Sequence, residues 1–129
     1  MLLDIDIDSF ELKHKFTISR GSKNSAEVIT VSIKDSGFIG LGECVPYKRY
    51  GESIESVSKE ILSVPLPANN EKLQTILKHG AARNAIDCAL WDLQAKKKGK
   101  PVWKLLNLTE PKPTCLLYTS DAADDVRSG

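Results

Sequence analysis

The sequence has few cysteines, little net charge and no long apolar run, and each absence excludes a class of protein. Of its three cysteines we interpret Cys44 and Cys88 as small core residues, and their wide separation argues against a disulfide framework or a paired zinc motif. With 18 Lys and Arg against 17 Asp and Glu, no net field attracts nucleic acid or anionic lipid. No apolar run approaches the roughly 18 residues that span a bilayer, and the start MLLDIDIDSF lacks a signal-peptide pattern. We therefore expect a cytoplasmic protein without nucleic-acid or membrane partners.

Catalytic motifs are also missing from these 129 residues. The G-x-G of GLGECV has Val45 where the dinucleotide fingerprint requires a third glycine. Asp87 and Asp92 are five residues apart on an expected helix and point about 140° apart, so they cannot share one metal ion. The HExxH, GxSxG and phosphate-loop patterns do not occur. The chain is also too short for a (β/α)₈ barrel, which takes about 250 residues.

What is present first predicts β-strands. Apolar and acidic residues alternate over residues 3–7, which predicts a half-buried strand that continues as far as Leu12. The segments VITVSIKD at 28–35 and FIGLGECV at 38–45 flank a short turn and predict a β-hairpin. Gly40 and Gly42 leave alternate positions of the return strand without side chains, so we expect another element to pack closely there. The small polar residues at 19–25, SRGSKNS, predict a loop.

Helices are expected after the hairpin. Ser53 is a candidate N-cap for the first, Asn70 for a second over 71–79, and residues 81–99 form the longest periodic segment. Pro101 suits the first turn of a further short helix. Strands followed by helices indicate an α+β fold, which we expect to be a three-stranded antiparallel meander followed by a three- to four-helix bundle.

Two segments concentrate basic and aromatic residues where they leave adjacent strands. The first carries Arg20 and Lys23, and the second is YKRY at 47–50. Cationic groups suit a carboxylate ligand, and tyrosines add rigid contact area. The residues alone leave two interpretations open, namely a surface that binds an acidic ligand and a pair of ordinary solvated loops.

Three segments, followed by GKPVWKLLNL, carry a family pattern: FTISRGSKNSAEVITVSI at 16–33, GECVPYKRYGES at 42–53 and AARNAIDCALWDL at 81–93. Together they resemble the N-terminal capping domain of the enolase superfamily, in its mandelate racemase and muconate-lactonizing branch, and most closely its dipeptide epimerases. The resemblance covers the chain to about residue 114. It implies that residues 1–113 are a capping domain. It also implies that the parent enzyme is a Mg²⁺-dependent epimerase of L-Ala-D/L-Glu type dipeptides, which removes and returns the Cα proton through an enediolate.

In that family the catalytic bases and the carboxylate ligands of Mg²⁺ lie on barrel strands. The resemblance therefore implies that these 129 residues hold no catalytic residue or metal ligand and bind no cofactor. It also implies that two loops form a lid that selects the distal part of a small-molecule dipeptide substrate. The lid residues carried over by position are Phe16, Ile18, Arg20 and Lys23 on the first loop, and Tyr47, Arg49 and Tyr50 on the second.

The last residues depart from the family pattern. We interpret 114–129 as the start of a first barrel strand that runs into a polar, artefactual or disordered tail. The expectation is an inactive N-terminal fragment, with oligomerisation left open and with the Gly40 and Gly42 face exposed where a barrel would cover it. The alternatives are the cap of a muconate cycloisomerase or an o-succinylbenzoate synthase, and a free-standing module that binds an acidic ligand.

Overall fold

A three-stranded antiparallel sheet forms one layer of the molecule. The computed structural model describes residues 1–18 and 21–114. Within these ranges, only the backbone is described for residues 15–18 and 21–24. The strands are β1 (Leu2–Ile18), β2 (Gly21–Asp35) and β3 (Phe38–Cys44), in the order β1-β2-β3. The predicted meander and hairpin are therefore confirmed.

The first hairpin is longer than the sequence indicates. β1 continues well past Leu12, and residues 21–25, predicted to lie in a loop, belong to β2. Antiparallel pairing of Phe16 with Lys23 and of Ile18 with Gly21 holds this end of the hairpin together. The loop prediction was wrong because partner strands satisfy backbone groups whatever the local composition.

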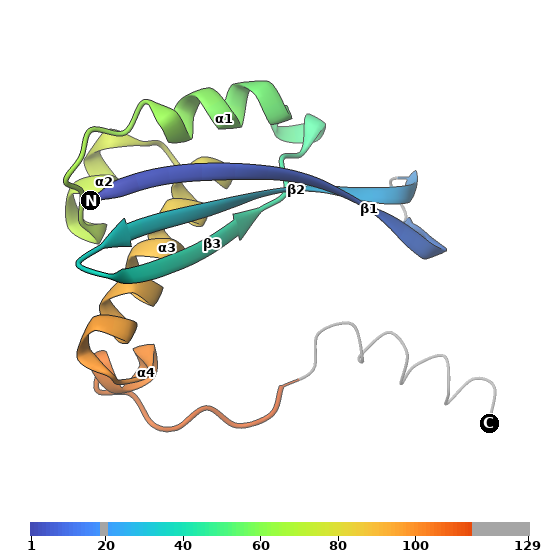
Figure 1. Ribbon diagram of the computed structural model, residues 1–129. Coiled ribbons are helices and arrows are strands. Elements are labelled where there is room, and N and C mark those ends of the chain that lie inside the picture. The colour runs from blue at the N-terminus through green and yellow to red at the C-terminus, as the bar shows by residue number, and fades with distance from the viewer. Residues whose placement is uncertain (19–20, 115–129) are drawn as a thin grey trace.

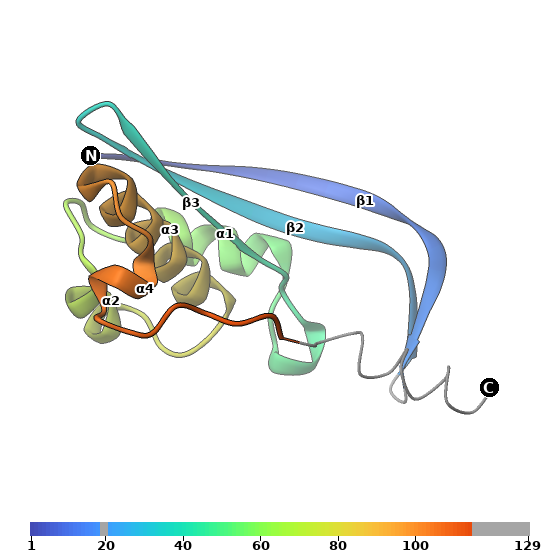
Figure 2. The ribbon, with the colours of Figure 1, turned by 90° about the horizontal axis from the view of Figure 1, so that it is seen from below.

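Helices form the second layer. They are the 3₁₀-helix η1 (Lys48–Tyr50) and the α-helices α1 (Ile54–Leu62), α2 (Asn70–Ile76), α3 (Ala81–Lys98) and α4 (Val102–Leu105). Figures 1 and 2 show α1, α2 and α3 together on one side of the sheet. The α+β fold with a small helix bundle is confirmed. Within the part of the chain that the structure describes, no helix is long and apolar enough to cross a membrane.

The helix caps explain where α1 and α2 begin. Ser53 caps α1 as predicted, and its hydroxyl accepts from the Ser56 N–H at 3.0 Å. Asn69, not Asn70, caps α2. The Asn70 amide instead donates to the Asp87 carboxylate at 2.8 Å and so ties α2 to α3. Assigning the cap one residue late is the ordinary error when two asparagines are adjacent.

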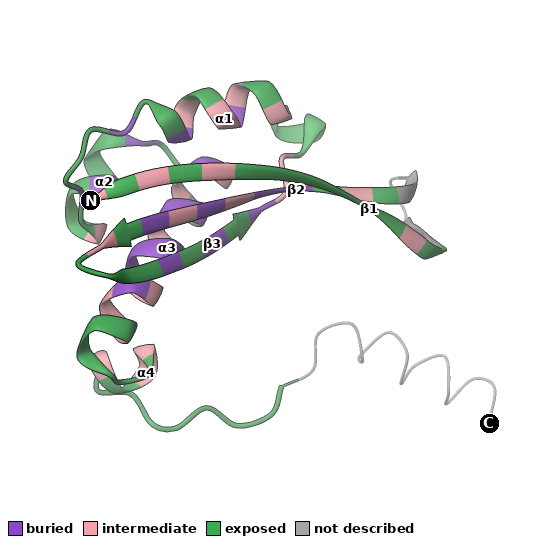
Figure 3. Cartoon of the chain, viewed as in Figure 1, coloured by how far each residue is buried: buried purple, intermediate pink, exposed green. Residues whose placement is uncertain are grey.

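The core lies between the sheet and the helices (Figure 3). β2 contributes its odd-numbered positions, because alternate side chains of a strand point to one face. α1 and α3 contribute apolar stripes with helical spacing. The fully buried larger side chains are Ile29, Val31, Ile33, Val57, Ile61, Leu73 and Ile86.

Helix α3 packs directly against the backbone of β3. A Cβ atom added to Gly42 would overlap the carbonyl oxygen of Ala85, and one added to Gly40 would overlap that of Ala89. The expected close approach at the two glycines is confirmed, and the element that makes it is α3. The expectation that this glycine face is exposed was therefore wrong.

Side chains of α3 also occupy the free edge of β3. The Leu41 N–H donates to the Asp92 carboxylate at 2.8 Å, and the Lys96 ammonium donates to the Ile39 carbonyl at 2.8 Å. Asp92 and Lys96 pair with each other at 2.8 Å. An edge strand otherwise presents these backbone groups to other chains, so the ion pair shields the edge from further pairing.

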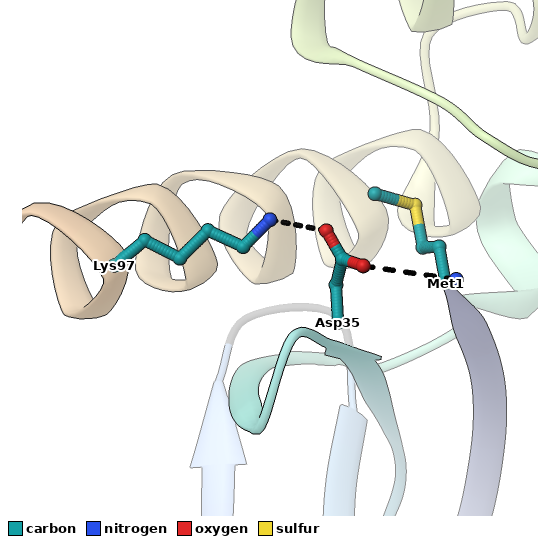
Figure 4. A network of polar contacts seen from close by, with 3 residues as sticks. All are labelled: Met1, Asp35 and Lys97. Carbon is teal, nitrogen blue, oxygen red and sulfur yellow. Dashed lines mark hydrogen bonds and ion pairs between the residues drawn. The ribbon is translucent and has the colours of Figure 1, made fainter.

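A second polar link joins the β2–β3 turn to the end of α3 (Figure 4). Asp35 pairs with Lys97, and its other oxygen lies 3.8 Å from the α-amino group of Met1. The hydrogen bond from Lys97 is the main cause that lowers the pKa of Asp35 below 3.8. Lysines 96–98 thus end the helix as solvated, dipole-compatible residues.

The two described cysteines differ. Cys44 is buried, as predicted, and burial together with the nearby Glu52 and Glu43 raises its pKa to about 11. Cys88 is exposed, so its assignment to the core was wrong. At 100° per residue, position 88 lies roughly 130° from the centre of the apolar stripe of α3.

Beyond the end of β3, β1 and β2 continue as a two-stranded arm, which consists of residues 8–18 and 21–28. The β1–β2 register shifts between Glu11 and Phe16. Figure 2 shows the arm extending past the helices and bending toward the side of the sheet on which they lie. The arm therefore reaches outside the packed part of the molecule.

Candidate functional site

The turn between β3 and α1, residues 47–52, is here called the η1 turn. Its backbone closes on itself, because the N–H groups of Tyr50 and Glu52 both donate to the Tyr47 carbonyl, at 3.0 and 3.1 Å. The Gly51 N–H donates to the Lys48 carbonyl at 2.9 Å. Gly51 has a φ of 73°, a left-handed conformation that glycine adopts without strain. A short connection can therefore hold a fixed shape.

Three of the predicted lid residues come together on this turn. The rings of Tyr47 and Tyr50 meet edge to face with centroids 6.3 Å apart. The Arg49 guanidinium lies 5.9 Å from the centre of the Tyr50 ring, within reach of a cation–π contact. Tyr47 is 45% exposed and Tyr50 is 68% exposed. The turn thus presents two tyrosine rings and a cation to the outside.

Glu52 connects the η1 turn to the start of α3. One oxygen of its carboxylate accepts from the Tyr47 N–H at 3.3 Å, and the other accepts from the Ala81 N–H at 2.8 Å. The residue that precedes α3 is Gly80, which has no side chain to cap the helix. The Glu52 carboxylate takes that role and places a negative charge at the positive end of the helix dipole.

Sequence reasoning missed Glu52. Its partner Ala81 lies 29 residues further along the chain, so no local pattern joins them. The one available signal was a long helix that opens with Gly80 and two alanines and so lacks a capping side chain of its own. Such a helix needs an acceptor from elsewhere in the fold.

A hollow of about 520 Å³ lies between the η1 turn and the segment that leads into α3. Tyr47, Tyr50 and Glu52 line it on one side, and His79 and Asn84 line it on the other. The hollow is open to solvent and has a mixed polar and apolar lining. The Glu52 carboxylate therefore lies at the hollow that separates the η1 turn from the start of α3.

The other predicted lid residues lie at the tip of the arm. Phe16 and Lys23 are opposite each other on paired strands, and Ile18 is opposite Gly21. Arg20 lies outside the described residues. Figure 2 places the arm tip and the η1 turn at the same end of the molecule. The two predicted halves of the lid therefore lie at one end, the first on the β1–β2 arm and the second on the turn between β3 and α1.

The described residues do not fit a Mg²⁺ site. Among them, no group of three or more His, Cys, Asp or Glu side chains could hold a metal ion. Asp87 accepts from Asn70, and Asp92 accepts from Leu41 and pairs with Lys96. These two carboxylates serve the packing of α3.

The fold of this chain is that of a known protein family, whose model matches most of the chain. Residues 5–107 match the family model "Mandelate racemase / muconate lactonizing enzyme, N-terminal domain". The chain belongs to this family, which is the N-terminal part of enolase-superfamily enzymes. The residues that the structure describes contain this domain and no barrel.

Individual relatives narrow the class. The chain is 44% identical over 117 residues to the L-Ala-D/L-Glu epimerase of Escherichia coli (strain K12), which covers 87% of this chain and 36% of that protein. It is 43% identical over 94 residues to an N-acetyl-D-glutamate racemase of a Pseudoalteromonas species. That match covers 68% of this chain and 30% of the racemase. The chain spans about a third of the length of these relatives.

Solved structures agree with this picture. One is an enolase family member from Agrobacterium tumefaciens with homology to dipeptide epimerases, solved with sodium and L-Ala-L-Glu bound. It has a TM-score of 0.78 and 46% identity, over 83% of this chain and 34% of that one. An L-Ala-D/L-Glu epimerase has a TM-score of 0.76 and 38% identity, over 85% and 34%.

Proposed function

We propose that this chain supplies the capping domain, residues 1–113, of a Mg²⁺-dependent epimerase of L-Ala-D/L-Glu type dipeptides. The observation that carries the proposal is its similarity, at 44% identity, to the Escherichia coli epimerase of that name. The dipeptide bound in the Agrobacterium tumefaciens relative supports the same substrate class. Epimerisation inverts one carbon next to a carbonyl group, so a proton must leave and return.

The proton-transfer chemistry is assigned to a part of the enzyme other than the residues described. When bound, Mg²⁺ supplies charge stabilisation for an enediolate. No ligand set for it exists among the described side chains, so no step is assigned to them. We propose that the chain alone neither epimerises a dipeptide nor holds Mg²⁺ at a defined site.

The role proposed for this chain is recognition of the distal part of the substrate. Tyr47 and Tyr50 offer rigid contact area, and Arg49 offers a positive charge beside them. Lys23 on the arm would add positive charge, as would Arg20, which lies outside the described residues, and positive charge suits a substrate side chain that ends in a carboxylate. Lysine at position 23 provides charge without a bidentate fork, so preference for Glu over other acidic residues is expected to be weak.

A chimeric enzyme tests the proposal. Residues 1–113 would replace the matching segment of the Escherichia coli epimerase, and epimerisation of L-Ala-L-Glu would be followed by polarimetry. We expect activity in the chimera and none in the 129-residue chain alone. A folded but inactive chimera, or an active isolated chain, would contradict the proposal.

The Pseudoalteromonas relative favours a second candidate, an acidic N-acyl amino acid as substrate. Such a substrate shares the glutamyl carboxylate of the dipeptide, but an acetyl group replaces the N-terminal alanine and its free amino group. Assaying the chimera with L-Ala-L-Glu and with N-acetyl-D-glutamate side by side separates the two. A higher kcat/KM for the N-acetyl compound would replace the dipeptide in the proposal.

A further inference from the structure

We infer that Glu52 is a positioning residue for the η1 turn. Its carboxylate holds the turn against the start of α3 and so sets the direction in which Tyr47 and Tyr50 face a substrate. This inference rests on the proposed function, because it takes the η1 turn to be part of the surface that recognises the dipeptide.

The geometry of the carboxylate carries the first step. Its two oxygens serve two different elements, the Tyr47 N–H at 3.3 Å and the Ala81 N–H at 2.8 Å. The Glu52 N–H in turn donates to the Tyr47 carbonyl at 3.1 Å. Glu52 and Tyr47 are therefore joined in both directions, and any shift of Glu52 relative to α3 shifts Tyr47 with it.

The second step is that the turn has little apolar anchoring. None of Lys48, Arg49 and Tyr50 is buried, so packing does not fix their orientation. A hydrogen bond to a charged acceptor is stronger than one between neutral groups. The carboxylate is thus well suited to determine how the turn sits on the molecule.

The third step concerns the other end of the link, which is rigid. Ala81 is followed by the buried residues Ala82, Ala85 and Ile86, which hold α3 in the core. Gly80 has a φ of 158°, and a Cβ there would lie 3.0 Å from the bonded Glu52 oxygen. Gly80 therefore gives the Glu52 carboxylate room to reach the helix. The hydrogen bond to Ala81 thus accounts both for a glycine at position 80 and for a glutamate at position 52.

A simple helix cap is the competing explanation. A cap alone would affect the stability of α3 and leave the η1 turn in place. A positioning role requires in addition that the Tyr47 end of the link matters for substrate recognition. The two explanations differ in what happens at Tyr47 and in how KM changes.

The first experiment uses the 129-residue chain and does not depend on activity. Glu52→Gln keeps the shape but has one acceptor oxygen, so it cannot serve both N–H groups, and Glu52→Ala serves neither. Glu60→Gln is the matched control, because it removes the same charge at the same hollow and its side chain makes no hydrogen bond among the described residues. Amide hydrogen exchange and amide chemical shifts would be measured by NMR at Tyr47 and Ala81.

We expect Glu52→Ala to lose protection about tenfold at both amides, and Glu52→Gln to lose it at the amide left without an acceptor. Shifts are expected across residues 47–51 in both variants, and the control should match the parent. Unchanged Tyr47 shifts and protection in both Glu52 variants would overturn the inference. If Glu52→Ala does not fold, Glu52→Gln decides the question: it breaks the link between the two elements by losing one bond, and unchanged shifts across residues 47–51 in it would overturn the inference.

The second experiment places the same substitutions in the chimeric epimerase. For Glu52→Gln we expect KM for L-Ala-L-Glu to rise about tenfold while kcat changes less than about threefold, because recognition and not proton transfer is disturbed. The Glu60→Gln chimera is expected to match the parent chimera. An unchanged KM in an active Glu52→Gln chimera overturns the inference, even if the amide chemical shifts and exchange rates change in the first experiment. A parent chimera without activity counts against the proposed function, and the amide measurements then decide on Glu52.

Discussion

The sheet has two regions that differ in how they are held. The packed region, residues 29–44 with the facing part of β1, has three strands and α3 lying against its backbone. The arm, residues 8–18 and 21–28, has two strands and extends past the helices (Figure 2). The same strands β1 and β2 run through both regions, so the difference comes from what covers them.

The comparison indicates that burial is concentrated in one part of the same two strands. Buried apolar side chains concentrate in the packed region, whereas side chains from Ser9 to Glu11 are exposed. A two-stranded ribbon alone has marginal stability in water. Substitutions should therefore cost much in one region and little in the other.

The largest expected effect is at Gly42 in the packed region. Gly42→Ala places a methyl group on the Ala85 carbonyl oxygen, so α3 must move away from β3, and we expect a loss of about 4 kcal/mol in the free energy of unfolding. Urea denaturation followed by circular dichroism measures it. Gly37→Ala is the control, since nothing lies near that position and only its φ of 84° opposes the change, at a cost of about 1 kcal/mol. If Gly42→Ala and Gly37→Ala lowered the free energy of unfolding equally, the contact between α3 and β3 would not be the main support of this region.

A core truncation on β2 comes next. Ile33 is fully buried, so Ile33→Ala should cost about 3 kcal/mol through lost burial and the cavity it leaves. The measurement is again the free energy of unfolding in urea. A cost below about 1 kcal/mol would mean that the packed region collapses around the gap and is less rigid than its contacts indicate.

The link between α3 and the edge of β3 should have a smaller effect that depends on pH. Asp92→Ala removes the acceptor of the Leu41 N–H and the partner of Lys96, and we expect a loss of about 1 kcal/mol at pH 7. Thermal denaturation over a range of pH measures it. Asp6→Ala, an exposed aspartate on β1, is the control and should change stability by less than about 0.5 kcal/mol.

The sign of the pH dependence follows from the pKa of Asp92. Burial alone would raise this pKa, but hydrogen bonds from Lys96 and Leu41 lower it below 3.8. The stabilisation is then complete above the unfolded pKa near 4 and is lost as the pH falls through the lower folded value. The gap in stability between parent and Asp92→Ala should therefore narrow on acidification. A gap that widens would show that the carboxylate is not held in its charged form.

The smallest effect is expected in the arm. Phe10 is 55% exposed, so Phe10→Ala should change the free energy of unfolding by less than about 0.5 kcal/mol, despite the size of the side chain removed. Comparison with Ile33→Ala in the same urea experiment gives the contrast between the regions directly. A loss above about 1.5 kcal/mol would show that the arm packs against the rest of the chain in solution.

The packed region was largely predictable from the sequence. Alternation on β1, the hairpin and the stripe of α3 each follow from local periodicity, and Gly40 and Gly42 indicated a close neighbour before that neighbour was known. Cys88 shows the same rule misapplied, because its position in the period of α3 already places it outside the stripe.

The arm and the η1 turn were less predictable, for different reasons. Residues 21–25 have a loop-like composition, and only pairing with a distant strand makes them part of β2. Tyr47, Arg49 and Tyr50 were chosen from a resemblance, which could not show how the three side chains lie relative to one another. Glu52 depends on a partner 29 residues away, a contact that exists only in the folded chain.

The contact of the β3 glycines with the α3 alanines also constrains the lengths of both elements. Two residues along a strand advance about 6.7 Å, and the four residues from Ala85 to Ala89 advance about 6 Å along a helix. Because Gly40 meets Ala89 and Gly42 meets Ala85, helix and strand run in opposite directions with nearly commensurate steps. Adding or deleting a single residue in either element would break this match and carry Asp92 away from Leu41, so β3 and α3 should tolerate changes of length only in the turns that flank them.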